Sequence, residues 1–262
     1  MLIVGHRGAR GEAPENTLSG FNYLKSLGIK SVELDVQITA DQQLVVFHDQ
    51  LLQPKSTGVG YIANQSLAEL KQLQIQHDYF LVAEKIPTLN EVLEIINDFD
   101  HIQLEVKVFA SNRLLLDALA QQIAVIYQQY PQQVIVTSFS VGFLKLLQQK
   151  YPYVVRGLLL EEYCFGHPDY DNEDYDAEIF WPTDKALALA QELACQWIIP
   201  QSKILNKHHN FVREAHAQGL NVSTWTVNLE YEMQDLTKMG VDSMITDFPK
   251  RAIQTLMPTG KL

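Results

Sequence analysis

Residues 32–49 read VELDVQITADQQLVVFHD, and their first half alternates apolar with acidic or polar side chains. Such alternation in a run rich in valine is typical of a β-strand, in which residues two apart share a face. Glu33 and Asp35 therefore lie on one face of this strand, and the valines and leucine beside them lie on the other. Burying two unpaired carboxylates is costly, so we expect a positive group next to them.

The rest of the chain alternates short strands with amphipathic stretches. We expect strands at 2–5, 31–37, 102–108, 133–137, 154–160, 197–199, 220–226 and 241–246. Helical patterns occupy 112–129, 141–150, 184–194, 206–218 and 229–239, among others. Glycines such as Gly28, Gly219 and Gly240 stand between a helix and the next strand, as is usual for helix C-caps. Eight strands alternating with helices over about 250 residues predict a (β/α)8 TIM barrel.

A doubly wound parallel sheet is the alternative architecture, but the chain has no G-x-G-x-x-G or Walker A motif to favour it. Two stretches break the regular spacing of a barrel. Residues 44–88 form an insertion after the second strand, with a short strand over 44–48, a loop and a helix over SLAELKQLQI. Residues 161–182 are acidic and aromatic, and we expect them on the catalytic face. We interpret residues 1–262 as a single domain that includes the insertion.

Composition limits the partners and the location of the protein. The chain of 262 residues has a net charge of −11 and 47% hydrophobic residues. This charge argues against nucleic acid or an anionic membrane as the main partner, and no apolar run is long enough for stable membrane insertion. The N-terminus has no secretory signal pattern, so we expect a cytoplasmic protein. Two cysteines do not form a disulfide framework.

The third strand repeats the pattern of the second. Glu105 and Lys107 share one face, so three carboxylates and one lysine point into the barrel near its C-terminal mouth, where barrel enzymes have their active sites. An internal salt bridge is the simpler interpretation of any one of them. Because two negative charges remain, we expect a divalent ion held by oxygen ligands, Mg²⁺ or Ca²⁺. Zn²⁺ fits less well, since no histidine pair has ligand spacing there.

Two histidines end apolar runs at the same mouth. His6 follows LIVG, and His48 follows LVVF. Imidazole titrates near neutral pH, so the two are candidates for a general acid and a general base. Arg7 offers a planar fork that suits phosphate oxygens. Together with Lys107 and a divalent ion, these side chains predict phosphoryl transfer.

Several motifs resemble those of the glycerophosphodiester phosphodiesterase family. They are HRG (6–8), PENT (14–17), ELDV (33–36), VVFHD (45–49), IPTLNEVL (86–93), LEVK (104–107), TSF (137–139), WTVN (225–228) and GVDSMITDFP (240–249). They cover nearly the whole chain in the order of the family. The resemblance implies a (β/α)8 barrel with a small insertion that hydrolyses glycerophosphodiesters to glycerol 3-phosphate and an alcohol.

The resemblance also implies roles for individual residues. Glu33, Asp35 and Glu105 would bind the metal, and His6 and His48 would be the acid–base pair. The phosphate would be bound by Arg7 and Lys107. Trp225 would lie against the glycerol, although ordinary barrel packing is the alternative for this side chain. The nucleophile would be either water or the 2-hydroxyl of the substrate itself.

The chain departs from the family at three loops. GIKS (28–31) replaces the usual GAD, TADQQ replaces the T-x-D-G turn, and QPKST (53–57) replaces an arginine–threonine pair. These departures affect loop geometry and substrate preference. The acidic, aromatic segment 161–182 could receive a cationic alcohol such as choline, or could be a solvated loop. A lysophospholipase D activity and a non-catalytic phosphodiester-binding barrel are the alternative functions. The sequence does not indicate an oligomeric state.

Overall fold

The computed structural model describes residues 1–81, 83–109, 113–161 and 183–257. Eight parallel strands form a closed ring. They are β1 (Leu2–Gly5), β2 (Ser31–Ile38), β4 (His101–Val106), β5 (Val134–Ser138), β6 (Arg156–Leu160), β7 (Trp197–Pro200), β8 (Asn221–Thr224) and β9 (Ser243–Thr246). Each strand pairs with its neighbour in chain order, and β1 pairs with both β9 and β2, which closes the barrel. The predicted TIM barrel is confirmed.

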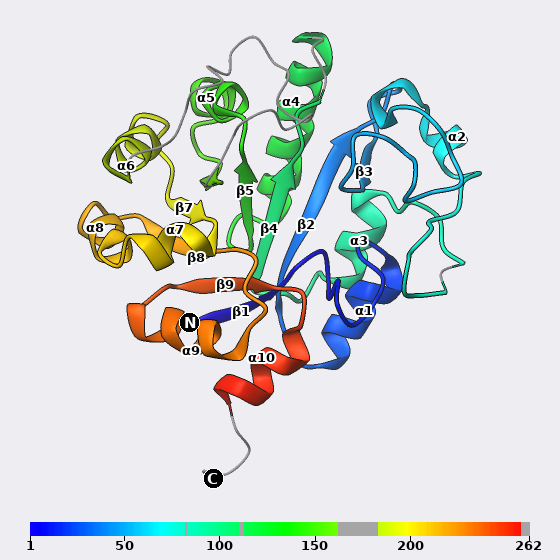
Figure 1. The fold of residues 1–262 in the computed structure, drawn as a ribbon. Helices are drawn as coiled ribbons and strands as arrows, with labels where there is room; N and C mark the ends of the chain where they lie inside the picture. The colour runs from blue at the N-terminus through cyan, green and yellow to red at the C-terminus, as the bar shows by residue number, and fades with distance from the viewer. Residues whose placement is uncertain (82, 110–112, 162–182, 258–262) are drawn as a thin grey trace.

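Helices surround this barrel and lie outside the strands (Figure 1). They are α1 (Leu18–Ser26), α3 (Leu89–Ile95), α4 (Arg113–Gln129), α5 (Val141–Lys150), α6 (Thr183–Glu192), α7 (Ser202–Lys207), α8 (Phe211–Ala217), α9 (Glu230–Met239) and α10 (Pro249–Leu256). In the part of the chain that the structure describes, none of these helices is long and apolar enough to cross a membrane. The cytoplasmic location stays a prediction.

The two faces of each strand have different surroundings. Val32, Leu34 and Val36 belong to the large hydrophobic cluster between the strands and the helices. Val4 and Ile199 belong to a smaller cluster contributed by strands β1, β6, β7 and β9. Glu33 and Asp35 alternate with these outward-facing residues along β2, so their side chains point into the barrel.

The insertion is attached to the outer part of β2. Strand β3 (Leu44–Val46) is antiparallel to β2 and pairs with residues 36–38, beyond the point where β1 pairs with β2. Figure 1 shows β3 and the short helix α2 (Leu67–Leu70) beside β2, outside the ring of strands. A separate cluster that includes Phe47, Ile62 and Ile86 is buried beneath this segment, which also contains a 3-10 turn, η1 (Ile62–Asn64). The extent of a single domain over 1–262 stays a prediction.

Two expected helices differ from the prediction. The pattern over 206–218 is divided, because the backbone of His208 leaves the helical region (φ −126°, ψ 74°) and α8 begins only at Phe211. In the insertion, α2 is a single turn. After it, the backbone NH groups of Gln72 and Leu73 donate to Glu69 O and Leu70 O in three-residue turns, and residues 74–76 pair with residues 55–57.

The glycines expected at helix ends adopt the left-handed conformation. The φ angles are 76° at Gly28, 77° at Gly219 and 83° at Gly240. A residue with a side chain is strained in this region, so these positions explain how each helix turns back to its following strand.

Candidate active site

Three carboxylates meet at the C-terminal mouth of the barrel. Glu33 and Asp35 extend inward from β2, and Glu105 extends from the neighbouring position on β4, because Asp35 and Glu105 are register partners. Each residue offers one oxygen, and these atoms all lie within 4.8 Å of one another. All three residues are buried. Their close approach follows directly from the alternation of side chains along the two strands.

The donor atoms of this cluster fit a divalent cation. Glu33 Oε1 and Asn16 Oδ1 are buried and have no hydrogen-bond partner in the described part of the chain. The Asn16 amide donates to Asp35 Oδ2 at 2.8 Å, so its unpaired oxygen belongs to the same cluster of side chains. Carboxylate and amide oxygens are the ligands that both Mg²⁺ and Ca²⁺ accept. A metal ion would neutralise the repulsion and give the unpaired oxygens a partner.

The two carboxylates on β2 have opposite pKa shifts. Burial raises the pKa of Glu33 well above its ordinary value, and the charges of Asp35 and Glu105 raise it further. Burial also opposes ionisation of Asp35, but Lys107 and Arg7 outweigh it and hold the pKa of Asp35 below its ordinary value. In the protein without metal, the ionised form of Glu33 is therefore disfavoured, whereas the ionised form of Asp35 is favoured.

Arg7 and Lys107 both contact Asp35. The Arg7 Nε lies 3.2 Å from Asp35 Oδ2, and the Lys107 Nζ lies 3.2 Å from Asp35 Oδ1. Lys107 also pairs with Glu105. Burial opposes the charge of both cations, but the surrounding carboxylates raise the pKa of each above its ordinary value. Two fixed positive charges thus border the carboxylates, as the sequence led us to expect.

The turn after β1 places His6 and Arg7 next to the cluster. A Cβ on Gly5 would lie 2.0 Å from the carbonyl oxygen of Gly8, so only glycine fits this position. Arg7 has a φ of 50°, which is uncommon for a residue with a side chain. Its backbone NH donates to Glu33 Oε2 at 3.0 Å, which fixes the turn on the carboxylate cluster.

His6 is oriented by a chain of hydrogen bonds that begins at β9. Its Nδ1 lies 2.6 Å from Asp247 Oδ1, and the Asn228 amide donates to Asp247 Oδ2 at 2.7 Å. The Nε2 of His6 lies 3.9 Å from Glu33 Oε2 and so faces the carboxylates. Burial and the charge of Arg7 lower the pKa of His6, although Asp247 raises it. The neutral ring therefore has a free Nε2 directed at the site when Nδ1–H donates to Asp247.

His48 has a carboxylate partner of its own. Its Nδ1 lies 2.6 Å from Asp49 Oδ1. The backbone on both sides of His48 is tied to β2, because Gln37 Nε2 donates to Phe47 O at 2.7 Å and to Asp49 O at 2.9 Å. The strand that carries two acidic side chains thus also positions this histidine.

Sequence reasoning did not assign roles to Asp247, Asn228 and Gln37. A signal was present for each of them. Asp247 and Asn228 lie within the GVDSMITDFP and WTVN motifs, and Gln37 continues the inward series of Glu33 and Asp35 on β2. Their contacts depend on which strand ends are neighbours in space.

Trp225 directly follows β8 and is partly buried. Its indole NH donates to Ile199 O at 3.0 Å, and its ring packs edge-on against Phe139 with centroids 5.5 Å apart.

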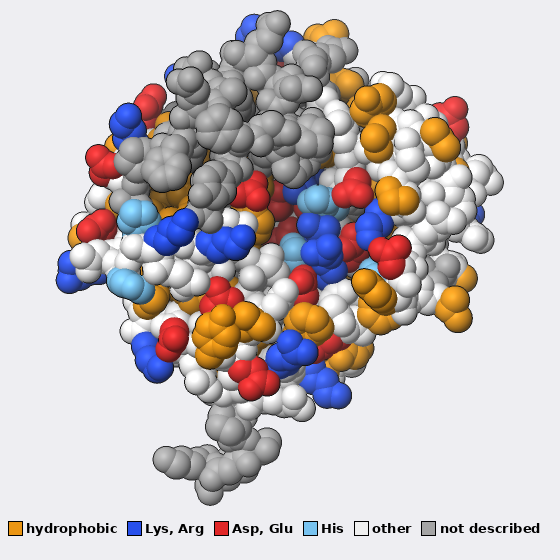
Figure 2. All heavy atoms as spheres, in the orientation of Figure 1, with side chains coloured by type: hydrophobic (Ala, Val, Ile, Leu, Met, Phe, Trp, Pro, Cys, Tyr) orange, Lys and Arg blue, Asp and Glu red, His pale blue; other side chains and the backbone are white. Residues whose placement is uncertain are grey.

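The segment 162–182, for which we considered a role in binding the alcohol, lies outside the described residues. Figure 2 shows histidine, acidic and basic side chains gathered in a hollow at the middle of one face.

Comparisons with known proteins show the family of this chain. The model of the glycerophosphoryl diester phosphodiesterase family matches residues 6–251. A glycerophosphodiester phosphodiesterase of Caldanaerobacter subterraneus is 30% identical over 99% of both chains. Another from Bacillus altitudinis is 28% identical over 96% of both chains. The chain belongs to the glycerophosphoryl diester phosphodiesterase family, which makes it a phosphoric diester hydrolase.

A solved structure extends the comparison to three dimensions. A phosphodiesterase of Oleispira antarctica, described in complex with the product sn-glycerol-3-phosphate, superimposes with a TM-score of 0.80. It is 25% identical, and the match covers 98% of this chain and 97% of that chain. The family and its barrel, expected from the motifs, are confirmed.

Proposed function

We propose that this enzyme hydrolyses glycerophosphodiesters to sn-glycerol 3-phosphate and an alcohol, with one divalent metal ion bound by Glu33, Asp35 and Glu105. The observation that carries the proposal is the buried cluster of these carboxylates beside two histidines, each with its Nδ1 bonded to an aspartate. The family membership and the product complex of the Oleispira enzyme support the same reaction. The small product in that complex supports a small-molecule substrate.

The two histidines would divide the proton transfers between them. His6 is more buried, and its Nε2 faces Glu33, so we assign it as the general base that takes the proton of the nucleophile. His48 lies further out, where its side chain is 22% exposed, and it would donate a proton to the leaving alcohol. The bond between phosphorus and the alcohol oxygen breaks as that oxygen gains the proton.

The positive groups would bind and orient the phosphate. Arg7 and Lys107 border the carboxylates and supply charge-assisted hydrogen bonds to phosphate oxygens. When bound, Mg²⁺ or Ca²⁺ would supply Lewis-acid stabilisation of negative charge on the phosphate. Trp225, at the end of β8, would lie against the glycerol.

A coupled assay for glycerol 3-phosphate release tests the reaction and the site together. We would use glycerophosphocholine as substrate with EDTA, Mg²⁺ or Ca²⁺, and compare the wild type with Glu33→Ala and His48→Ala. We expect metal-dependent turnover that both substitutions abolish. A matched control is His209→Ala, since His209 is exposed between α7 and α8, and we expect it to have wild-type activity.

Two other outcomes would favour the alternative functions. A folded wild-type protein that binds the diester without turnover under any metal would indicate a binding barrel. Turnover of lysophospholipids alone would indicate a lysophospholipase D. Either result would contradict the proposed function.

A substrate with an acidic alcohol tests the assignment of the histidines. Glycerophospho-p-nitrophenol has a leaving group that departs without a proton. His48→Ala should therefore recover much of its activity on this substrate, whereas His6→Ala should remain impaired on both substrates. Recovery by His6→Ala instead would reverse the two roles.

The configuration at phosphorus distinguishes the two nucleophiles. Attack by water gives inversion with an isotopically labelled chiral substrate. Attack by the 2-hydroxyl followed by hydrolysis of the cyclic phosphate gives retention. The buried position of His6 is compatible with either nucleophile, so this measurement decides the route.

A further inference from the structure

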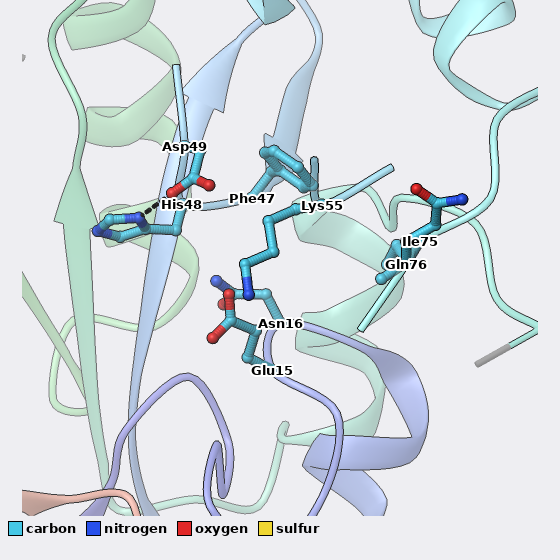
Figure 3. A pocket seen from close by; sticks show the side chains of 8 residues that line it. All are labelled: Glu15, Asn16, Phe47, His48, Asp49, Lys55, Ile75 and Gln76. Atoms are coloured by element: carbon cyan, nitrogen blue, oxygen red, sulfur yellow. Dashed lines mark hydrogen bonds and ion pairs between the residues drawn. The ribbon is translucent and has the colours of Figure 1, made fainter. Parts of the chain in front are cut away.

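A pocket opens beside His48, between the insertion and the loop that precedes α1. It is small and partly open to solvent. Its walls are formed by Glu15, Asn16, Phe47, His48, Asp49, Lys55, Ile75 and Gln76. Figure 3 shows the Lys55 side chain extending toward Glu15 and Asn16, with His48 and Asp49 on one side and Ile75 and Gln76 on the other. A group held here would lie next to the histidine that we assign as the general acid.

The two carboxylates of this pocket already have partners. Glu15 lies 2.7 Å from Arg10 Nε and 3.5 Å from an Arg7 nitrogen. Asp49 lies 2.6 Å from His48 Nδ1. The two arginines compensate the charge of Glu15, and Asp49 is hydrogen-bonded to the ring of His48.

Lys55 is the charged group of the pocket with the weakest partner. Within the described residues, its one ion pair is with Asp78, at 3.7 Å, and the Asp78 side chain is 78% exposed. An exposed pair at this distance contributes little. The ammonium group of Lys55 is therefore available to bind an anionic group that enters the pocket, and its own side chain is only 24% exposed.

Lys55 also lies where this chain departs from its family. The segment QPKST (53–57) replaces the usual arginine–threonine pair. The cation that this chain places at the wall is therefore the compact ammonium group of Lys55, which can set a preference among substrates.

The position of the pocket separates it from the expected glycerol site. Trp225 follows β8, which is separated from β2 by β9 and β1 around the barrel. The pocket lies on the other side, where β3 and the insertion adjoin β2. A diester whose phosphate lies at the carboxylate cluster would direct its two ends into these two sectors.

We propose that this pocket binds the leaving alcohol and that Lys55 favours alcohols that carry an anionic group, such as the carboxylate of serine. The inference rests on the proposed function, in which His48 protonates the same alcohol. Lys55 is then a residue that determines specificity, because it contacts the substrate outside the bonds that break.

Two substrates that differ by a single carboxylate test the inference. Glycerophosphoserine and glycerophosphoethanolamine are otherwise alike. We would measure kcat/KM for each substrate and divide the value for glycerophosphoserine by the value for glycerophosphoethanolamine, for the wild type and for Lys55→Met. Because only the wild type makes a charge-assisted hydrogen bond to the carboxylate, we expect the ratio to fall by about tenfold in Lys55→Met. Lys55→Arg should retain the preference, and Asp78→Asn should increase it by removing the competing carboxylate.

Lys30→Met is the matched control. Lys30 precedes β2 at the opposite end of the barrel, is 53% exposed, and lies 3.7 Å from Asp98. The substitution Lys30→Met removes the same charge from the protein as Lys55→Met, so it controls for a general electrostatic effect. We expect the wild-type ratio.

Other outcomes would overturn the inference. An unchanged or increased ratio in Lys55→Met would exclude recognition of the carboxylate, while turnover by the wild type would leave the proposed function intact. Wild-type protein that releases glycerol 3-phosphate from neither substrate would contradict the proposed function and the inference together. If Lys55→Met does not fold, the ratios of Lys55→Gln and Asp78→Asn provide the same test.

Discussion

The Nδ1 atom of His6 lies 2.6 Å from Asp247 Oδ1, although 241 positions separate the two residues in the chain. The contact exists because β1 and β9 are neighbours in the barrel, with Gly5 paired to Thr246. His6 and Asp247 each come directly after a strand, so their side chains meet at the same mouth. This bond fixes which nitrogen of His6 faces the carboxylate cluster.

Asp247→Asn should lower kcat more than it raises KM. The asparagine amide can donate to Nδ1 and favour the ring form whose Nε2 carries the proton, which cannot act as a base. We expect a loss of about 10- to 100-fold in kcat, a part of what acid–base catalysis contributes. Steady-state kinetics with glycerophosphocholine measure it.

Asp242→Asn is the control for this substitution. Asp242 also bonds a histidine, with its Oδ2 2.8 Å from His216 Nε2, but the pair is partly exposed and distant from the site. We expect wild-type kcat. Equal losses in the two variants would indicate a general structural effect and contradict a positioning role for Asp247.

Gln37→Leu should impair catalysis without removing any group that contacts substrate. The substitution keeps the volume of the side chain but removes both hydrogen bonds to the backbone around His48. We expect kcat to fall by about tenfold through misplacement of His48. Gln122→Leu is the matched control, because the Gln122 amide donates to Gln42 O on the surface. Normal kcat in Gln37→Leu would show that the turn is positioned by other contacts.

Glu33→Gln should stabilise the protein without metal and abolish stabilisation by metal. The pKa of Glu33 is raised by burial and by Asp35 and Glu105, so the free energy of unfolding falls as the pH rises above the ordinary range of this carboxyl group. We expect the variant in EDTA to have a higher Tm than the wild type. Saturating Mg²⁺ or Ca²⁺ should raise the Tm of the wild type but not that of Glu33→Gln.

The exposed Glu94 on α3 provides a matched control, since Glu94→Gln also removes one carboxylate charge. This variant should keep both the Tm in EDTA and the shift on adding metal. A metal-induced shift retained in Glu33→Gln would remove Glu33 from the set of ligands.

His101 should make stability depend on pH. It is buried at the start of β4, where it bonds Gln103 at 2.8 Å and contacts Trp197 edge-on. Burial lowers its pKa from 6.5 to about 4. The unfolded chain therefore binds a proton first as the pH falls, so the free energy of unfolding decreases from about pH 6.5 to about pH 4.

We expect this single group to account for about 3 kcal/mol over that window. Urea denaturation of the wild type and of His101→Gln across the window measures the difference. The variant should show a shallower slope, whereas His209→Gln, at an exposed histidine, should match the wild type. Parallel slopes for His101→Gln and the wild type would exclude this contribution.

The alternation of strands with helical stretches was sufficient to predict the barrel, and the alternation of side chains along two strands predicted its carboxylate cluster. Glu33, Asp35 and Glu105 lie on inward positions of adjacent parallel strands, and the C-terminal ends of such strands converge. The same reasoning located His6 and His48 after strands β1 and β3. It failed for residues 206–218, where apolar spacing continued through a break in the helix at His208.

The contacts between distant segments were decided by tertiary structure. The bond between His6 and Asp247 requires the ring to close between β1 and β9, and the bonds of Gln37 require the turn after β3 to return across β2. Arg7 and Lys107 were predicted from their charge, but only the folded chain shows that both contact Asp35. Periodicity in a sequence determines the face of a strand on which a side chain lies, because it reports the backbone geometry of one element. The partner of that side chain depends on strand order, register and the path of the loops, which no single element contains.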